Sequence, residues 1–563
     1  MLISNLDLLA TASGGVARLR ELILTLAVQG KLVPQNPNDE PTSELLKRIR
    51  AEKDRLIAEG RIKRDKPLPP IAEDELPFKL PRGWNCARLD ELSIFVVDCP
   101  HSTAKFVSKG LLCIDTNSFK EGALLPQKLR YVDEATFVER IARLQPEPGD
   151  LVFSREGSVG ESIIIPEGVV ACLGQRVMLF RFSKSISNEL VRLVITSKGF
   201  LDKLLTLHKG IGAKHVNVRD MRLAVVPVPP IAEQSRIVTR VEELMRLCDA
   251  LEAKGQLEAT QHAQLVSTLL STLTESETPE ELAENWQRIA THFGLLLDRP
   301  EAVDVLEQTI LQLAVRGLLV PQDPRDEPAS ELLRKIRAEK DKLIAEGKNK
   351  RDKLLPPIAD NSSPCALPIG WAWMRFAELG HFCGGKTPST HRSTYWDGDI
   401  PWITPKDMKQ PLLSDSEDKV THLALADGLT LIPMQSVLMV VRSGILRRTL
   451  PTAINNVETT INQDLKALVL VRPALAAYVQ LLICGFEGFI LKNLTKVGTT
   501  VESMQFDEFT AQPFPLPPLV EQTRIVTRVA QLRRLCADLR QRLTASQSTQ
   551  ALLAEALIAD LPT

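Results

Sequence analysis

Residues 26–71 read LAVQGKLVPQNPNDEPTSELLKRIRAEKDRLIAEGRIKRDKPLPPI, and residues 313–358 read LAVRGLLVPQDPRDEPASELLRKIRAEKDKLIAEGKNKRDKLLPPI. The two stretches align at a constant offset of 287 positions without an insertion. Solenoid repeats have much shorter periods, of about 20–50 residues, so each copy belongs to a larger unit. The sequence therefore predicts a tandem duplication of a domain-sized structure.

The repeated stretch predicts two helices in each copy. Residues 16–28 place apolar side chains at helical spacing, and Gly30 follows them. The next helix is expected to start with Ser43 as its N-cap and to end at Gly60. Its leucines and isoleucines share one face and its charged residues the other, which is typical of a helix at a surface.

A second repeat follows each variable region, at 231–254 (IAEQSRIVTRVEELMRLCDALEAK) and at 519–542 (LVEQTRIVTRVAQLRRLCADLRQR). Its apolar residues alternate four and three apart, which predicts a coiled-coil seam in each long helix. The offset here is 288, so the second copy carries one net insertion, which lies between Gly157 and Gln175. The seam residues are Ile237, Val241, Leu244, Cys248 and Leu251 in one helix and Ile525, Val529, Leu532, Cys536, Leu539 and Leu543 in the other.

These patterns predict a mixed α+β fold. Two similar α/β domains would be joined by long antiparallel coiled-coil helices in a pseudo-twofold arrangement, with the two seams packed on each other. The expected boundaries are a helical region at 1–80, a first variable domain at 81–228, a central helical region at 229–370, a second variable domain at 371–516 and a C-terminal helix at 517–563. Strand-like runs such as GDLVFS and RVMLFRF place sheets in the variable domains.

Bulk properties narrow the class of protein. The 563 residues carry a formal charge of −1, and 44% of them are hydrophobic, which is ordinary for a globular protein. The nine cysteines form no CxxC pairs or ligand clusters, which favours a reducing cytoplasm over a disulfide framework or zinc site. The N-terminus lacks a signal pattern. The apolar window 465–486 contains Lys466 and Arg472, and we interpret it as core elements rather than as a membrane span.

Catalytic motifs are poorly supported. Residues 380–387 (GHFCGGKT) match the phosphate-loop pattern GxxxxGK[ST], but the turn-rich PSTHRSTYWDG that follows predicts no helix to bind phosphate. The sequence contains no [DNS]PP[YFW] tetrapeptide of an adenine methyltransferase and no HExxH motif. We therefore expect no catalytic residue, no cofactor-binding residue and no metal ligand in this chain, and we interpret 380–387 as a recognition loop.

Loop cations and hydroxyls in the variable domains are the candidates for DNA contact. Arg, Ser and Thr side chains can read base edges, and Lys mostly anchors phosphates. Arg155 and Arg442 stand out because the duplication retains both beside a glycine, although a salt bridge inside the domain is the alternative for each. Trp396 and Trp402 are better interpreted as core. The predicted DNA-binding residues are Lys105, Ser154, Arg155, Lys209, Lys214 and His215, then Lys386, Thr387, Ser389, Thr390, Arg392, Tyr395, Arg442, Ser443, Arg447, Arg448, Lys496 and Thr499.

Several motifs together resemble the DNA-specificity subunit of type I restriction–modification systems. They are PPIAEQSRIV and PPLVEQTRIV at the two domain exits, PGDLVFSREGSVG with LGQRVML in the first domain, and GGKTPST with YWDGDIPWITPKDM in the second. The resemblance implies two target-recognition domains, each reading one half of a split, asymmetric sequence in double-stranded DNA. It also implies that helices act as a ruler between the half-sites.

The same resemblance implies partners and cofactors. Two methyltransferase subunits would dock on the helices, and restriction–translocase subunits would join the complex. S-adenosylmethionine, ATP and Mg²⁺ would be used by those partners, and this chain would be a non-catalytic cytoplasmic subunit without a membrane contact. Two alternatives stay open from the residues alone. One is a duplicated protein–protein scaffold, and the other is a phosphate-loop NTPase.

Overall fold

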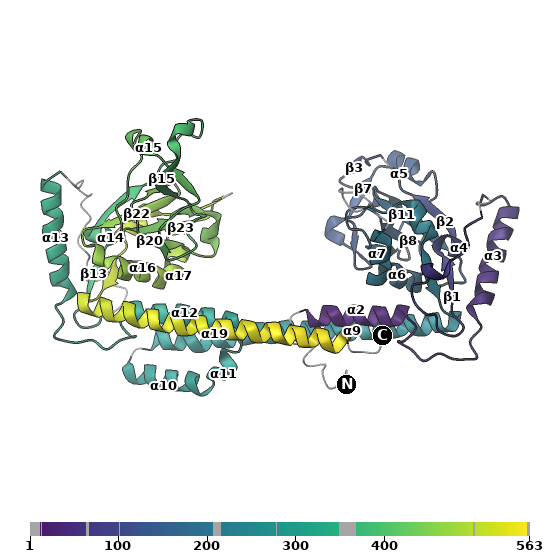
Figure 1. The fold of residues 1–563 in the computed structure, drawn as a ribbon, viewed down its shortest axis with the longest axis horizontal. Coiled ribbons are helices and arrows are strands. Elements are labelled where there is room, and N and C mark those ends of the chain that lie inside the picture. The colour runs from purple at the N-terminus through teal and green to yellow at the C-terminus, as the bar shows by residue number, and fades with distance from the viewer. Residues whose placement is uncertain are drawn as a thin grey trace. The chain divides into compact units, whose positions relative to one another are not determined.

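The computed structural model describes residues 12, 14–63, 67–100, 102–206, 215–276, 278–347, 358, 367–498 and 501–559. The chain divides into two compact units. Unit 1 comprises residues 1–258 and 547–563, and unit 2 comprises residues 259–546. Each unit contains a mixed domain of strands and short helices packed on a helical frame (Figure 1). This mixed α+β class is the one that the sequence predicts.

The repeated stretch forms the same two helices in both units. They are α2 (Gly15–Val28) and α3 (Thr42–Ala58) in unit 1, and α12 (Pro300–Val315) and α13 (Ala329–Ala345) in unit 2. The predicted cap at Ser43 is wrong, because α3 begins one residue earlier, at Thr42. The Thr42 hydroxyl is buried and donates a hydrogen bond to the carbonyl of Val228 instead of capping a helix. Thr42 thereby ties the helix to the end of the domain.

A glycine with positive φ ends each first helix of the repeat. Gly30 and Gly317 have φ of 70° and 76°. A Cβ atom at Gly30 would lie 2.7 Å from the ring of Trp84, and one at Gly317 would lie 3.0 Å from the ring of Trp371. These glycines are therefore required both by the backbone and by the close approach of a tryptophan.

In unit 1 the domain contains two four-stranded sheets. One has the order β2-β11-β8-β9 and the other the order β10-β4-β7-β3, with β1 and β12 paired beside them. The strands are β1 (Asn85–Arg88), β2 (Ser93–Asp98), β3 (Phe106–Val107), β4 (Leu111–Ile114), β7 (Arg130–Val132), β8 (Leu151–Ser154), β9 (Ser162–Ile164), β10 (Ala171–Leu173), β11 (Val177–Phe182) and β12 (Val225–Val228). A short hairpin of β5 (Phe119–Lys120) and β6 (Ala123–Leu124) lies between them in sequence.

Helices cover these sheets in unit 1. They are α4 (Leu89–Leu92), α5 (Glu134–Ile141), α6 (Asn188–Thr196), α7 (Lys198–Thr206) and α8 (Val218–Leu223), and the long helix α9 (Ile231–Glu275) starts directly after β12. The central strand β11 is almost entirely buried, with Val177, Met178, Leu179 and Phe180 fully enclosed. Both cores of the domain draw on this strand, because its alternate side chains face opposite sides of the sheet.

In unit 2 the corresponding sheet has the order β14-β22-β18-β20-β16. Two three-stranded sheets, β17-β15-β21 and β19-β24-β23, and the pair β13–β25 complete the domain. The strands are β13 (Ala372–Met374), β14 (Gly380–Gly384), β15 (Trp396–Ile403), β16 (Leu412–Leu413), β17 (Asp418–Val420), β18 (Val437–Val440), β19 (Arg442–Ser443), β20 (Thr452–Asn455), β21 (Thr460–Ile461), β22 (Leu465–Leu470), β23 (Thr495–Lys496), β24 (Glu502–Met504) and β25 (Phe514–Leu516).

The helices of unit 2 are α10 (Pro279–Thr291), α11 (Phe293–Leu296), α14 (Phe376–Leu379), α15 (His422–Ala426), α16 (Ala476–Gly485), α17 (Glu487–Asn493), α18 (Phe506–Ala511) and most of the long α19 (Leu519–Ala559). Residues of α19 from 547 on belong to unit 1, and residues of α9 from 259 on belong to unit 2. Within this unit α16 and α17 lie next to α12, whereas α15 lies at the far end of the domain (Figure 1). The apolar window 465–486 forms β22 and α16, whose leucines belong to the core of the unit. Its interpretation as core elements is confirmed.

The two domains share one skeleton. β11 pairs antiparallel with β2 and β8, and β22 pairs antiparallel with β14 and β18. β1–β12 and β13–β25 are the corresponding antiparallel pairs that join the start of each domain to its exit. The sequence offsets of 287 and 288 therefore correspond to equivalent strands.

The seams of the long helices pack first against the short helices of their own unit. Ile237, Val241 and Cys248 of α9 share a core cluster with Ile23 and Ala27 of α2. In unit 2, Ile525, Val529 and Cys536 of α19 share a core cluster with Leu306, Ile310 and Leu313 of α12. Packing of the two seams on each other, and the pseudo-twofold arrangement of the units, stay predictions.

Candidate nucleic-acid interface

Each domain is fastened to its long helix by a buried tryptophan–glutamate contact. The indole Nε1 of Trp84 donates a 3.0 Å hydrogen bond to Glu233, and Trp371 donates one of 3.1 Å to Glu521. Both glutamates are 1% exposed. Burial raises the pKa of each carboxyl, and the hydrogen bond from the tryptophan acts in the opposite direction.

Two further contacts repeat at this junction. The side-chain amide of Gln234 donates to the carbonyl of Pro229, and Gln522 does the same to Pro517, both at 2.9 Å. An ion pair also links the long helix to the turn before the second helix of the repeat, through Arg236–Asp39 in unit 1 and Arg524–Asp326 in unit 2. The PPxxEQxRIV motif is therefore a structural joint that sets the direction in which each domain leaves its helix.

A small sheet gathers several of the predicted DNA-binding residues of unit 2. In the sheet β19-β24-β23, Arg442 of β19 and Lys496 of β23 both stand opposite Ser503 of β24. Directly opposed residues of antiparallel strands place their side chains on the same face. Arg442, Ser503 and Lys496 therefore form one polar row, in which the two cations lie about 10 Å apart across two strand spacings.

Both cations of this row, Arg442 and Lys496, are exposed. Arg442 is exposed, and the described part of the chain offers its guanidinium no ion pair or hydrogen bond. By contrast, Arg447 is held by Glu502 at 3.1 Å, and the Ser443 hydroxyl accepts a hydrogen bond from the backbone N–H of Ile445. Arg448 is exposed beside them. The sheet thus presents cations of two kinds, one available and one already neutralised.

The loop after β14 carries a second group of candidates. Lys386, Ser389 and Thr390 are exposed, and the Thr387 hydroxyl donates to Gln463 at 2.5 Å. Arg392 stacks over the ring of Tyr395. Its guanidinium carbon lies 5.4 Å from the ring centroid, which is within the usual range of a cation–π contact. Tyr395 is itself buried, so it supports Arg392 rather than offering its own ring to solvent.

This loop is not a phosphate loop. Residues 380–384 form strand β14, and the residues after them run without an α-helix to the single 3₁₀ turn at Ser393–Tyr395. A phosphate loop requires backbone N–H groups at the N-terminus of a following helix. The NTPase alternative therefore lacks its phosphate-binding element.

The retained arginine of unit 1 has a different environment. Arg155 lies 3.0 Å from Asp98, and its side chain is only 12% exposed. The strand register does not place Arg442 at the position of Arg155. Ser154 pairs with Val177 and Val440 with Leu465, so Val441 stands where Arg155 does. Arg442, which pairs with Ser503, stands where Glu156 does, which pairs with His215. For Arg155 the geometry favours the salt bridge inside the domain, which is the alternative that the sequence leaves open.

The remaining candidates differ in their surroundings. Lys105 is exposed and stays a prediction, and His215 is half-buried with its Nε2 3.1 Å from the side-chain oxygen of Asn217. Ser154 is fully buried in β8, so it cannot contact DNA without a rearrangement of the sheet. The predicted residues Lys209, Lys214 and Thr499 lie outside the described residues.

Sequence patterns missed two features of the candidate DNA-binding domains, one in each unit. Ser503 completes the row between Arg442 and Lys496, but strand register alone reveals it. Arg130 stacks over the exposed ring of Phe106, with 4.8 Å between its guanidinium carbon and the ring centroid. Trp402 is buried and packs edge-on against half-buried Trp396 at 5.0 Å, which confirms that this pair belongs to the core of its domain.

The described residues show neither a metal-binding cluster nor a single membrane-spanning helix. Among the described residues no group of three or more His, Cys, Asp or Glu side chains has a geometry that could hold a metal ion. Within the same part of the chain, no single helix has the length and apolar character needed to cross a membrane. One bent pair, 473–485 with 487–493, meets that requirement only when its two helices are taken together.

Comparison with known proteins relates this chain to one protein family. The family model for the type I restriction modification DNA specificity domain matches residues 133–261 and 368–546. The EcoEI specificity subunit of Escherichia coli is 35% identical over 96% of this chain and 93% of its own length, and the EcoAI specificity subunit of the same organism is 36% identical over the same shares. A chain from a solved structure of a type I R-M system is 18% identical to this chain. The match covers 86% of this chain and 98% of that chain, with a TM-score of 0.47. The family match and the near full-length relatives show that this chain belongs to the DNA-specificity subunits of type I restriction–modification systems.

Proposed function

We propose that this chain is the non-catalytic specificity subunit of a type I restriction–modification complex, and that each of its domains reads one half of a split, asymmetric DNA sequence. One observation supports this most directly. The domains share strand pairings and the tryptophan–glutamate joint, but where unit 2 presents the exposed Arg442, unit 1 carries Glu156. A common skeleton with different exposed side chains suits two readers of different targets.

The polar row of unit 2 is the proposed contact with one half-site. An arginine can donate two hydrogen bonds to guanine, and a lysine mainly contacts phosphate. Arg442 would then read a base edge while Lys496 anchors the backbone beside it. Gln463 is exposed on the neighbouring loop and has the side chain that best pairs with adenine.

The chemistry would belong to the partners. Two methyltransferase subunits would bind S-adenosylmethionine and flip an adenine of each half-site out of the duplex. Restriction–translocase subunits would use ATP and Mg²⁺ for cleavage. This chain would position the DNA in the cytoplasm, with half-sites about one helical turn, or ~10 bp, apart from centre to centre.

Mapping methylated adenines in the host genome tests this function. The expected result is a two-part motif with an unspecified spacer, and the assembled complex should bind a duplex carrying both halves at least about a thousandfold more tightly than random DNA. A scaffold without DNA recognition would give no such motif. It would also give no salt-dependent binding of random duplex by the assembled complex.

A further inference from the structure

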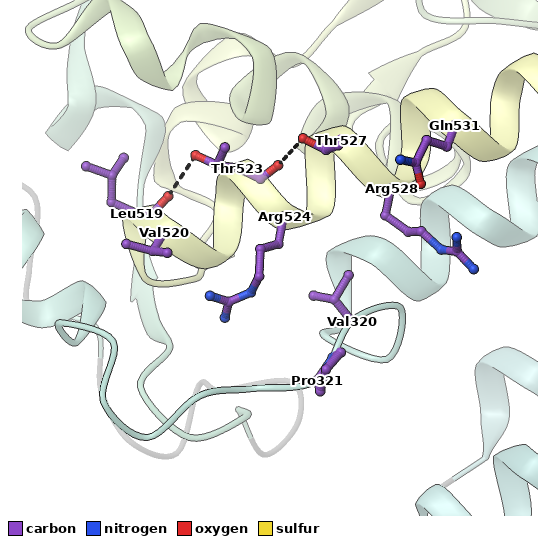
Figure 2. Close-up of a pocket in the computed structure, with 9 residues that line it drawn as sticks. All are labelled: Val320, Pro321, Leu519, Val520, Thr523, Arg524, Thr527, Arg528 and Gln531. Carbon is purple, nitrogen blue, oxygen red and sulfur yellow. Dashed lines mark hydrogen bonds between the residues drawn. The ribbon is translucent and has the colours of Figure 1, made fainter.

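A groove of about 680 Å³ opens on the frame of unit 2 (Figure 2). One wall is the first three turns of α19, and the other is formed by Val320 and Pro321, in the turn that follows α12. Leu519 and Val520 are 39% and 55% exposed in its lining. Exposed aliphatic side chains beside an open groove are typical of a surface that a partner covers.

The charge of this groove is positive. Arg524 and Arg528 extend from the same side of α19 (Figure 2), and none of the residues that line the groove is acidic. Arg524 is fixed by Asp326 at 2.6 Å. Arg528 is exposed, and within the described residues its guanidinium has no ion pair or hydrogen bond. The groove therefore suits a segment that combines aliphatic side chains with a carboxylate.

The duplication carries a similar lining in unit 1. Val33 and Pro34 correspond to Val320 and Pro321, and the ion pair Arg236–Asp39 corresponds to Arg524–Asp326. Ile231 replaces Leu519 with a side chain of similar size. Val33 is half-buried and Pro34 is exposed, as are their counterparts. Five of the nine lining residues are therefore identical in unit 1, whereas Val520, Thr523 and Gln531 are replaced there by Ala232, Ser235 and Glu243.

Exposed residues of this surface are retained where neighbouring exposed positions have diverged. Thr239 and Arg240 of α9 are identical to Thr527 and Arg528 of α19, and all four are exposed. The next exposed position has changed from Glu242 to Ala530. Core packing does not require identical residues on the solvent side of a helix. A shared partner does require them.

We propose that this groove and the equivalent surface of unit 1 are the docking sites for two copies of the methyltransferase subunit. Each would take the same aliphatic and acidic segment of that subunit, with its carboxylate on Arg528 in unit 2 and on Arg240 in unit 1. Two equivalent patches bind two copies of one protein because each patch recognises the same surface of its partner. This inference rests on the proposed function and adds the location of the partner's contact.

The two sites are unequal. Gln531 lines the groove of unit 2, whereas the equivalent position in unit 1 is Glu243, which forms a 3.0 Å ion pair with Arg240. A carboxylate arriving from the partner must displace Glu243 in unit 1 but meets no acid in unit 2. The first methyltransferase subunit therefore binds at unit 2 and the second at unit 1 with lower affinity.

Titration of the full-length chain with its cognate methyltransferase subunit tests the assignment, with copy number read by native mass spectrometry in the absence of DNA. Wild-type chain should bind two copies with different affinities. Arg528→Glu and Arg240→Glu should each lower the affinity of one site by at least about tenfold, and the double variant should lose both. Glu243→Gln should bring the two affinities closer together.

Arg542→Glu is the matched control, because Arg542 is an exposed arginine of α19 outside the groove. It should leave both copies bound. Arg528→Gln, which adds no charge, should give a smaller loss at the same site. The inference is overturned if the double variant still binds two copies with wild-type affinity, or if Arg542→Glu weakens binding as much as Arg528→Glu. If the wild-type chain bound no methyltransferase subunit, the proposed function would fail as well.

Discussion

Arg540 of α19 forms a 3.0 Å ion pair with Glu307 of α12, and the duplicated positions in the other unit carry the same pair with its charges exchanged. There Arg20 of α2, equivalent to Glu307, pairs at 2.9 Å with Glu252 of α9, equivalent to Arg540. If Arg20 of α2 stood opposite Arg540 of α19, or Glu307 of α12 opposite Glu252 of α9, like charges would meet. The exchange therefore favours the helix pairings that each unit uses.

The exchanged pair predicts a specific pattern of stability. Arg540→Glu should lower the free energy of unfolding by about 1 kcal/mol, because a partly exposed pair becomes a repulsion. Adding Glu307→Arg should recover only part of this loss, because Asp304 stays opposite residue 540 and Arg533 stays opposite residue 307. A double-mutant cycle from urea unfolding measures the coupling between the two residues. A coupling of zero would contradict a role in helix pairing.

Arg442 should affect base recognition at one half-site only. Lys496 should affect the affinity at that half-site whatever its base sequence. Arg442→Ala is expected to cost about 1–3 kcal/mol of binding to the half-site read by unit 2 and to relax its base preference. Lys496→Ala should weaken binding to all sequences and lower the salt dependence by about one phosphate contact. Fluorescence anisotropy with duplexes altered in one half-site at a time measures both effects.

The control for this experiment is Arg334→Ala, which removes an exposed cation of α13 in the same unit. It should leave DNA affinity unchanged within error. Equal losses at both half-sites after Arg442→Ala would contradict the model of two independent readers.

Arg155 should behave as a structural residue. Asp98→Ala leaves the poorly exposed Arg155 without its partner, so we expect a loss of about 2 kcal/mol in the free energy of unfolding. Arg442→Ala removes an arginine without such a partner and should change stability by less than about 0.5 kcal/mol. Thermal unfolding of the two variants side by side distinguishes these roles, and equal destabilisation would count against them.

The buried glutamates predict a dependence of stability on pH. Burial raises the pKa of Glu233 and Glu521 in the folded chain, so the folded state binds these protons more tightly than the unfolded state. Stability from these groups is present below the ordinary glutamate pKa of about 4.3 and is lost as pH rises through the higher folded pKa.

Glu521→Gln should therefore be more stable than wild type at pH 7, because it keeps an oxygen for Trp371 without a buried charge. The advantage should vanish below pH 4. Unfolding midpoints between pH 4 and 8 test this expectation, with Trp371→Phe as the control that removes the hydrogen bond itself. A constant difference between Glu521→Gln and wild type across this range would refute it.

The ruler hypothesis predicts a change in spacer length. Inserting four helical residues after Glu258 in α9 and after Ser546 in α19 lengthens both helices by about 6 Å, which corresponds to about 2 bp of duplex. Methylation of a DNA library with variable spacers should then shift to longer spacers. An unchanged spacer preference would mean that these helices do not set the distance.

The sequence by itself determined the duplication, the helices of the repeat and the shared strand skeleton. Those features follow from local periodicity, from Gly30 and Gly317 at helix ends, and from two constant offsets. The sequence also indicates that the phosphate-loop match is weak, because the residues after Lys386 lack a helical pattern. Local chemistry fixes such features, since each depends on residues close together in the chain.

Only the tertiary structure separated Arg155 from Arg442. Asp98, the partner of Arg155, lies 57 residues away in sequence, and nothing local indicates that Arg155 is neutralised while Arg442 is presented to solvent. The same holds for Ser154, which is buried by strands on both sides of β8, and for Ser503, which strand register places between two cations. Availability of a side chain is decided by contacts between distant segments, and sequence spacing carries no record of them.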